Sequence, residues 1–212
     1  MAYGRLIICT PRTHDLLHLS NIDGLVPDDA PPWVMESLTA TPWVVVRRAT
    51  ATSGRVAVGV RGLNRWQRHG LFIPIDRVAA RTSPEDLATV DARPCRLPAF
   101  QALAQVRILL HNTNLRWGPV GSVGFQLATG AGTAGPDSDL DIIVRVRHLE
   151  SSIRAQLTLV EEILRGCPAR VDCQVETPSG AVALTELVSG STHLLLRTKS
   201  GPHLVPTEQL VP

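Results

Sequence analysis

The chain has 212 residues, of which 44% are hydrophobic and 19% charged, and its formal net charge at pH 7 is +2. Such a chain is long enough to bury a sizeable core in one large domain or two small ones, which excludes an extended disordered protein. The near-neutral charge gives no support to bulk nucleic-acid binding.

The four cysteines form no C-x-x-C pair, and no histidine stands at zinc-ligand spacing from them. We therefore expect simple thiols in a reducing cytoplasm. The apolar run from Leu6 to Cys9 is too short for a signal peptide or a membrane span. The sequence thus predicts a cytoplasmic protein.

The first part of the chain predicts a small mixed α and β domain. Two prolines open a short amphipathic stretch at Trp33–Leu38, as prolines do in a first helical turn. Trp43–Arg48 and Arg55–Arg61 are β-branched, apolar runs and predict strands. The small, polar segment Ala49–Gly54 between them suits a hairpin turn.

The next segment contains the expected domain boundary. Ser83 to Asp86 predicts a helix start, because it combines a serine cap, a proline and two acids. Asp91–Pro98 holds two prolines and has no apolar periodicity. We therefore expect an N-terminal α+β substrate or partner domain over 1–95 and a catalytic domain over 96–212.

The second half predicts an alternation of helices and strands around one sheet, an α/β arrangement. The expected elements are a helix over 100–110, a glycine-rich loop over 128–136, a strand over 140–146, a helix over 149–164, a strand over 171–175, a helix over 179–188 and a last strand over 194–196.

Two acids stand at the start of the strand expected over 140–146. Asp139 and Asp141 are two residues apart, so on a strand both carboxylates point to one face with Cα atoms about 6.6 Å apart. They repel each other unless a cation lies between them. Mg²⁺ suits this position, because it takes one or two carboxylates together with substrate phosphates. The alternative is a solvated strand edge.

Gly121 and Ser122 supply a complementary feature. A glycine lets the backbone approach a phosphate, and a turn into a helix presents free N–H groups. Asp172, on the next expected strand, is a candidate third acid that helps hold metal and accepts a proton. A phosphate cradle beside metal-binding acids is typical of phosphoryl or nucleotidyl transfer.

These residues resemble the DNA-polymerase-β-like nucleotidyltransferase superfamily. Its pattern of hydrophobic-Gly-Gly/Ser, Asp-hydrophobic-Asp and a later acid is present here as Val120-Gly121-Ser122, Asp139-Leu140-Asp141 and Asp172. The spacer from Val123 to Ser138 is longer than usual, which implies an extended glycine-rich loop.

The longer string, GSVGFQLATG…PDSDLDIIVR, is similar to the phosphoribosyl-dephospho-CoA transferases of malonate decarboxylase, also called its holo-acyl-carrier-protein synthases. Further blocks agree, including PRTHDLLHL, WVVVRRA, VAVGVRG and RVDCQVETPSGAVAL, so the likeness covers nearly the whole chain.

The resemblance implies a specific reaction. The 2′-(5″-phosphoribosyl)-3′-dephospho-CoA unit passes from its triphosphate precursor to a serine of the apo acyl-carrier subunit of malonate decarboxylase, and diphosphate is released. It implies that Asp139 and Asp141 ligate Mg²⁺, that Asp172 assists, and that Gly121 and Ser122 hold the β and γ phosphates. Neither nucleic acid nor a membrane is an expected partner.

Other assignments stay open. Arg48 and Arg61 are candidates for phosphate or carrier contact, with ordinary surface arginines as the alternative. His14 and Asp15 have no assigned mechanism, and we expect Trp66 in the core rather than as a base-stacking platform. Two other functions remain: a transferase of the same superfamily that uses an ordinary nucleoside triphosphate, and a non-catalytic carrier-binding module.

Overall fold

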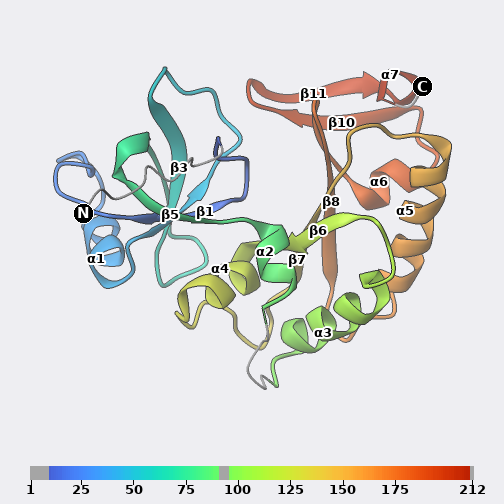
Figure 1. Ribbon diagram of the computed structural model, residues 1–212, viewed down its shortest axis with the longest axis horizontal. Coiled ribbons are helices and arrows are strands. Elements are labelled where there is room, and N and C mark those ends of the chain that lie inside the picture. The colour runs from blue at the N-terminus through green and yellow to red at the C-terminus, as the bar shows by residue number, and fades with distance from the viewer. Residues whose placement is uncertain (1–9, 91–95, 211–212) are drawn as a thin grey trace, which may run out of the picture. The chain divides into compact units, whose positions relative to one another are not determined.

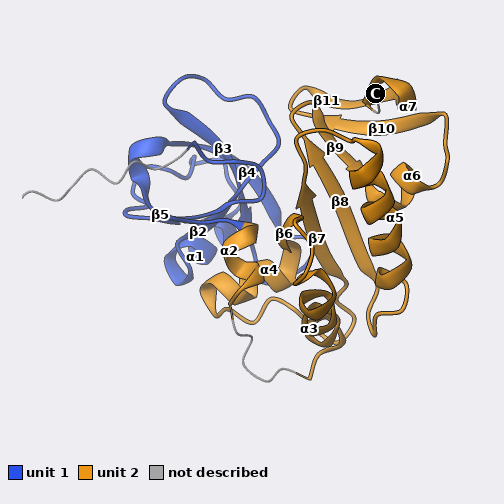
Figure 2. Cartoon of the chain, turned by 45° about the vertical axis from the view of Figure 1, so that its right-hand side comes forward, with its two compact units in different colours: residues 1–83 blue, residues 84–212 orange. Residues whose placement is uncertain are grey.

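A computed structural model describes residues 10–90 and 96–210 of the chain. The chain divides into two compact units, residues 1–83 and 84–212 (Figure 2). This division precedes the 95/96 boundary expected from the proline-containing segment, of which residues 91–95 lie outside the described residues. The reason is that the helix opened by Pro84 packs inside the second unit, where a Cβ on Gly118 would lie 2.8 Å from the Glu85 backbone nitrogen.

Over its described residues, 10–83, the first unit forms a five-stranded antiparallel sheet with one α-helix. Figure 1 shows their arrangement. Its strand order is β4-β3-β2-β1-β5. In chain order the elements are β1 (Leu16–Leu19), α1 (Pro32–Ala40), β2 (Trp43–Val46), β3 (Arg55–Arg61), β4 (Arg68–Pro74), the 3-10 helix η1 (Ile75–Arg77) and β5 (Val78–Thr82).

One face of this sheet forms a core with α1. Val34 and Leu38 of the helix are buried together with alternate strand residues such as Val44, Val58 and Ile73. The expected helix and the β2–β3 hairpin are confirmed. The strands β1, β4 and β5 were not predicted, because charged and polar residues interrupt their apolar pattern.

The second unit is built on a six-stranded sheet of order β11-β10-β9-β8-β7-β6. Only β7 and β8 run parallel; the other neighbouring pairs are antiparallel. The elements are α2 (Pro84–Ala88), α3 (Pro98–Leu110), β6 (Arg116–Pro119), α4 (Gly121–Thr129), β7 (Leu140–Arg145), α5 (Ser151–Leu164), β8 (Val171–Thr177), β9 (Gly180–Ala183), α6 (Leu184–Val188), β10 (His193–Thr198), β11 (Gly201–Pro206) and α7 (Thr207–Leu210).

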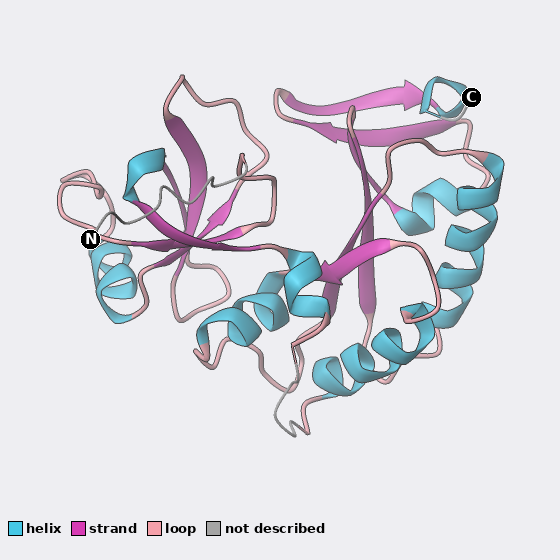
Figure 3. Ribbon diagram, viewed as in Figure 1, coloured by secondary structure: helices cyan, strands magenta, loops and turns pink. Residues whose placement is uncertain are grey.

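The two faces of this sheet differ in chemistry. Leu140, Ile142 and Val144 alternate along β7 toward a core that also contains buried residues of α3 and α5. These helices are drawn in cyan in Figure 3. The residues between them, including Asp141 and Arg145, therefore point to the opposite face. The helices thus bury the apolar face, and the acids of interest lie on the other one.

Two expectations for the C-terminal part are wrong. Residues 179–188 do not form one helix: Gly180–Ala183 is a strand, and only Leu184–Val188 is helical. Gly180 has φ +149° and pairs with Thr177, so the chain reverses at a two-residue turn and runs back along β8. The strand at 194–196 is not the last, because Gly201, with φ +124°, closes a second hairpin into β11.

The helices are short. None of those within residues 10–90 and 96–210 is long and apolar enough to cross a membrane. The mixed α and β class expected from the sequence is confirmed.

Candidate active site

The three candidate acids meet where β7 and β8 begin. Asp141 and Asp172 are directly paired in the parallel register, so their side chains share one face. Asp139 lies one residue before β7 and is not part of the strand. All three are half-buried. The strand starts therefore bring together the acids that the sequence singled out.

Arg170 provides the positive charge at this cluster. Its Nε and Nη2 donate hydrogen bonds of 3.1 and 2.8 Å to Asp172 Oδ1. The pKa of Arg170 is raised by this hydrogen bond and by the charge of Asp172, with further contributions from the charges of Asp139 and Asp141. All three carboxylates thus act on one cation, as expected for like charges held close together.

The start of α4 lies directly against Asp141. The backbone N–H of Val120 donates a 2.9 Å hydrogen bond to the Asp141 carbonyl oxygen. Gly121 has φ +61°, and a Cβ there would lie 2.8 Å from Asp141 Cγ and overlap Oδ2. Only glycine combines this backbone conformation with such close approach. Ser122 follows, half-buried, in the first turn of α4.

The spacer between Gly121 and the acids is more ordered than expected. Its first part belongs to α4, which ends at Gly130 with φ +75°. Gln126 Oε1 accepts hydrogen bonds from the backbone of Thr133 and Ala134, and Thr133 Oγ1 donates to the Ser122 carbonyl. The remaining loop therefore folds back onto α4 and supports the residues beside Asp141.

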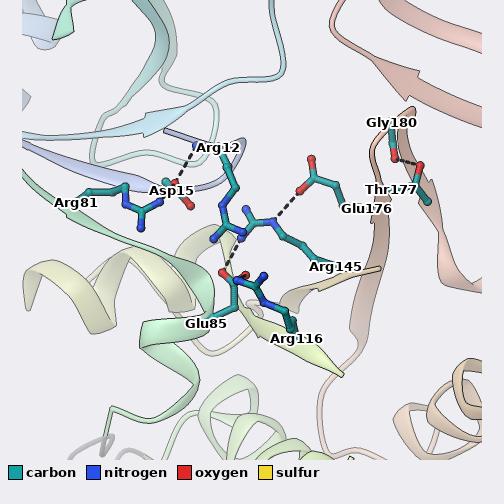
Figure 4. A network of polar contacts seen from close by, with 9 residues as sticks. All are labelled: Arg12, Asp15, Arg81, Glu85, Arg116, Arg145, Glu176, Thr177 and Gly180. Carbon is teal, nitrogen blue, oxygen red and sulfur yellow. Dashed lines mark hydrogen bonds and ion pairs between the residues drawn. The ribbon is translucent and has the colours of Figure 1, made fainter. Parts of the chain in front are cut away.

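A second polar cluster, which was not predicted from the sequence, lies at the other end of β7 and β8. Arg145 is paired with Glu85 of α2 and, at 3.0 Å, with Glu176 of β8 (Figure 4). Burial lowers the pKa of Arg145, but hydrogen bonds and charge from Glu176 and Glu85 outweigh it and raise the pKa overall. The sequence held one signal for this ion pair. Arg145 lies four residues after Asp141 and Glu176 lies four residues after Asp172, so two neighbouring parallel strands place them side by side.

The arginines of the first unit occupy different positions. Arg61 is directly opposite Arg68 on the sheet face that α1 does not cover. The Arg47 side chain lies over Gly70, where a Cβ would be 3.0 Å from the Arg47 Cζ. Arg48 follows the end of β2 and is half-buried. Sequence alternation alone did not reveal that Arg47 packs on a glycine.

Trp66 is not in the core. It is 75% exposed, and Leu63 in the same loop is 97% exposed. The β3–β4 loop closes on itself, because Gly62 N–H donates to the Gln67 carbonyl and Asn64 N–H donates to Gln67 Oε1. This turn leaves both large side chains outside the sheet.

Asp15 has a structural explanation. It is fully buried, and its Oδ2 accepts hydrogen bonds from the Arg12 backbone N–H, at 2.8 Å, and from Arg81 Nη1, at 3.0 Å (Figure 4). The intervening His14 has φ +69°, a left-handed conformation that is uncommon outside glycine. Asp15 therefore fixes the turn that leads into β1.

The acid cluster suits a magnesium ion in its donor chemistry. Among the described residues no three acidic, cysteine or histidine side chains stand ready to enclose an ion. Mg²⁺ does not require such a cage, since it keeps waters and is bound by one or two carboxylates and substrate phosphates. Arg170 already marks this position as one that stabilises positive charge.

Comparison with known proteins divides the chain at nearly the same place. A family model for the phosphoribosyl-dephospho-CoA transferase MdcG C-terminal domain matches residues 86–208, and one for the N-terminal domain matches residues 12–84. The chain belongs to the phosphoribosyl-dephospho-CoA transferase family. The family resemblance expected from the sequence is thereby confirmed, and the matched region includes Gly121, Asp139, Asp141 and Asp172.

Several curated phosphoribosyl-dephospho-CoA transferases are similar over nearly their full length. One from Pseudomonas putida is 45% identical and covers 92% of this chain and 93% of its own. Those from Azotobacter vinelandii and Pseudomonas aeruginosa are 43% and 39% identical, each over 92% of both chains. No solved structure shows significant similarity.

Proposed function

We propose that this chain transfers the 2′-(5″-phosphoribosyl)-3′-dephospho-CoA group from its triphosphate precursor to a serine of the apo acyl-carrier subunit of malonate decarboxylase. We further propose that residues 84–212 are a polymerase-β-like nucleotidyltransferase unit. The observation that carries both is the helix start at Gly121, which meets Asp141 while Asp172 lies beside it on β8. Similarity to named transferases over nearly the whole chain supports the substrate.

The reaction is a substitution at phosphorus. The serine oxygen of the carrier forms a bond to the α-phosphorus, the bond to the bridging oxygen breaks, and diphosphate leaves with the electron pair. Gly121 and Ser122 hold the β and γ phosphates through the N-terminal backbone of α4, which favours anions. Asp172 accepts the serine proton, and Arg170 must first release the Asp172 oxygen that it binds.

Asp139 and Asp141, assisted by Asp172, are the residues that would hold Mg²⁺. When bound, the ion offsets charge on the transferring and leaving phosphates. In the first unit, Arg48 and Arg61 are the proposed contacts for substrate phosphate or the carrier.

The test is the intact mass of purified apo carrier after incubation with this protein, Mg²⁺ and the triphosphate precursor. We expect a gain equal to the phosphoribosyl-dephospho-CoA unit, and loss of that gain when a chelator is added. Asp141→Asn should lower the rate by about a thousandfold or more, since a change of about 4 kcal/mol in the barrier corresponds to that factor. Asp137→Asn, at an exposed position two residues before Asp139, is the matched control and should retain activity.

The same assay separates the alternatives. Carrier modification with ATP or another free nucleoside triphosphate, and none with the precursor, would indicate an ordinary nucleotidyltransferase. Carrier binding without modification by any donor would indicate a non-catalytic module and contradict the proposal.

A further inference from the structure

A row of charged and small residues crosses the acid-bearing face of the second unit. Direct pairings connect Arg116 to Arg145, Arg145 to Glu176, Glu176 to Ala181, and Ala181 to Arg197. Directly paired residues point to one face of a sheet, and Asp172 lies four residues before Glu176 on the same strand. Arg197 therefore shares a face with the proposed catalytic acids.

Arg197 differs from the other arginines of the row. Arg116 and Arg145 are paired with acids, whereas Arg197 Nη1 is buried and has no hydrogen-bond partner within the described part of the chain. The nearest acid in the row, Glu176, is bound by Arg145, and Ala181 stands between it and Arg197. A buried donor without a protein partner is costly, so a ligand atom that accepts a hydrogen bond from it would be bound favourably.

The distance to the acids agrees with the chemistry of the substrate. Four residues separate Asp172 from the row, which is about 13 Å along the strands, and two strand spacings separate β8 from β10, about 10 Å. In the precursor, twelve covalent bonds through two ribose rings join the attacked phosphorus to the diphosphate of dephospho-CoA, a span of about 14 Å when extended. Together the two strand distances place the Cα atoms of Asp172 and Arg197 about 16 Å apart. This is about 2 Å more than the extended substrate span, and the long Arg197 side chain can cover the difference.

We infer that Arg197 binds the diphosphate of the dephospho-CoA moiety and so selects this substrate over ordinary nucleoside triphosphates. The inference rests on the proposed function, because it assigns a second contact for the same donor. Gln174 and Ala183 are directly paired and lie between the acids and the row. Both are uncharged, so neither side chain repels a phosphate at that position. A planar guanidinium with several donors suits such a group.

The first experiment measures binding rather than turnover. Dephospho-CoA carries the diphosphate but no triphosphate, so its dissociation constant for the full-length protein is determined by calorimetry. Arg197→Ala should raise that constant about 10- to 100-fold, and Arg197→Lys should raise it less. The control is Arg165→Ala, an exposed arginine at the end of α5, which should bind normally. Equal unfolding midpoints for the variants establish that they are folded.

Two further readings complete the test. Binding of inorganic diphosphate with Mg²⁺ should be unchanged in Arg197→Ala, and in carrier modification KM should rise while kcat stays within a few-fold. Dephospho-CoA binding that is unaffected by Arg197→Ala would overturn the inference, even with an active enzyme. So would a loss of binding confined to inorganic diphosphate. Arg197-dependent binding by a protein that modifies no carrier would support the subsite and refute the proposed function instead.

Discussion

Gly121 and the carboxylate of Asp141 are in contact with no space for a side chain between them. The contact joins the start of α4 to the start of β7, two elements separated by an ordered loop. It is reinforced by the hydrogen bond from Val120 N–H to the Asp141 carbonyl. The proposed phosphate-binding backbone and the proposed metal-binding acid are therefore held together by glycine geometry.

Gly121→Ala should slow transfer strongly. The new Cβ would collide with Asp141, and φ +61° is unfavourable for alanine, so the helix start or the carboxylate must move. We expect a loss of at least about a hundredfold in kcat/KM, because shifts of about 1 Å at a reacting centre have such effects. Gly132→Ala is the control: nothing lies within 4 Å of a Cβ there, and it should keep normal activity. Equal activity of the two variants would refute the role of this contact.

Arg170 should compete with magnesium for the acids. Its guanidinium binds Asp172 and lies in the field of Asp139 and Asp141, so its removal leaves three carboxylates less well compensated. Arg170→Gln should therefore tighten Mg²⁺ binding to the substrate-free protein by about two- to fivefold, the modest size reflecting an exposed ion pair. Calorimetric titration with MgCl₂ measures this. Weaker binding in Arg170→Gln would instead show that Arg170 organises the site.

The grouping of the three acids could be predicted from the sequence because its signals are local. Asp139, Asp141 and the glycine before Ser122 lie next to a strongly apolar strand, and that strand forms as expected. The position of the third acid, Asp172, could also be predicted, because its strand β8 comes next along the chain and pairs directly with β7. The contact between Gly121 and Asp141 depends on how α4 packs, which no spacing rule gives.

The elements that were missed depend on tertiary pairing. The segment 180–183 is rich in alanine, a helix former, yet it becomes a strand because Gly180 turns it back along β8. The ion pair of Arg145 with Glu85 was not predicted, because the two residues lie 60 positions apart and only the packing of α2 brings them together. Trp66 is exposed because hydrogen bonds between other residues close its loop, and its side chain takes no part in them.

Arg145 should be important for stability. Its side chain is 10% exposed, and its removal would leave the carboxylates of Glu85 and Glu176 close together without their shared cation. Arg145→Met should therefore lower the free energy of unfolding by about 3–5 kcal/mol, as for other broken buried ion pairs. Urea unfolding of the full-length protein measures this.

The matched control is Arg116→Met. Arg116 also pairs with Glu85 but is 62% exposed, so a loss of about 1 kcal/mol or less is expected. Similar losses in both variants would contradict the assignment.

Cys173 should make the protein less stable at alkaline pH. Burial, and then the charge of Glu161, raises the pKa of this thiol far above its ordinary value of 9.0. Above pH 9 the unfolded thiol loses its proton while the folded one keeps it, so the folded state binds more protons and the free energy of unfolding falls as pH rises. The contribution is up to about 1.4 kcal/mol per pH unit.

Urea unfolding from pH 7 to 10 should show a shallower decline in Cys173→Ala than in the wild type. Cys167→Ala should retain most of the decline, because Cys167 is only half-buried. Parallel curves for the wild type and Cys173→Ala would assign the alkaline loss to other groups.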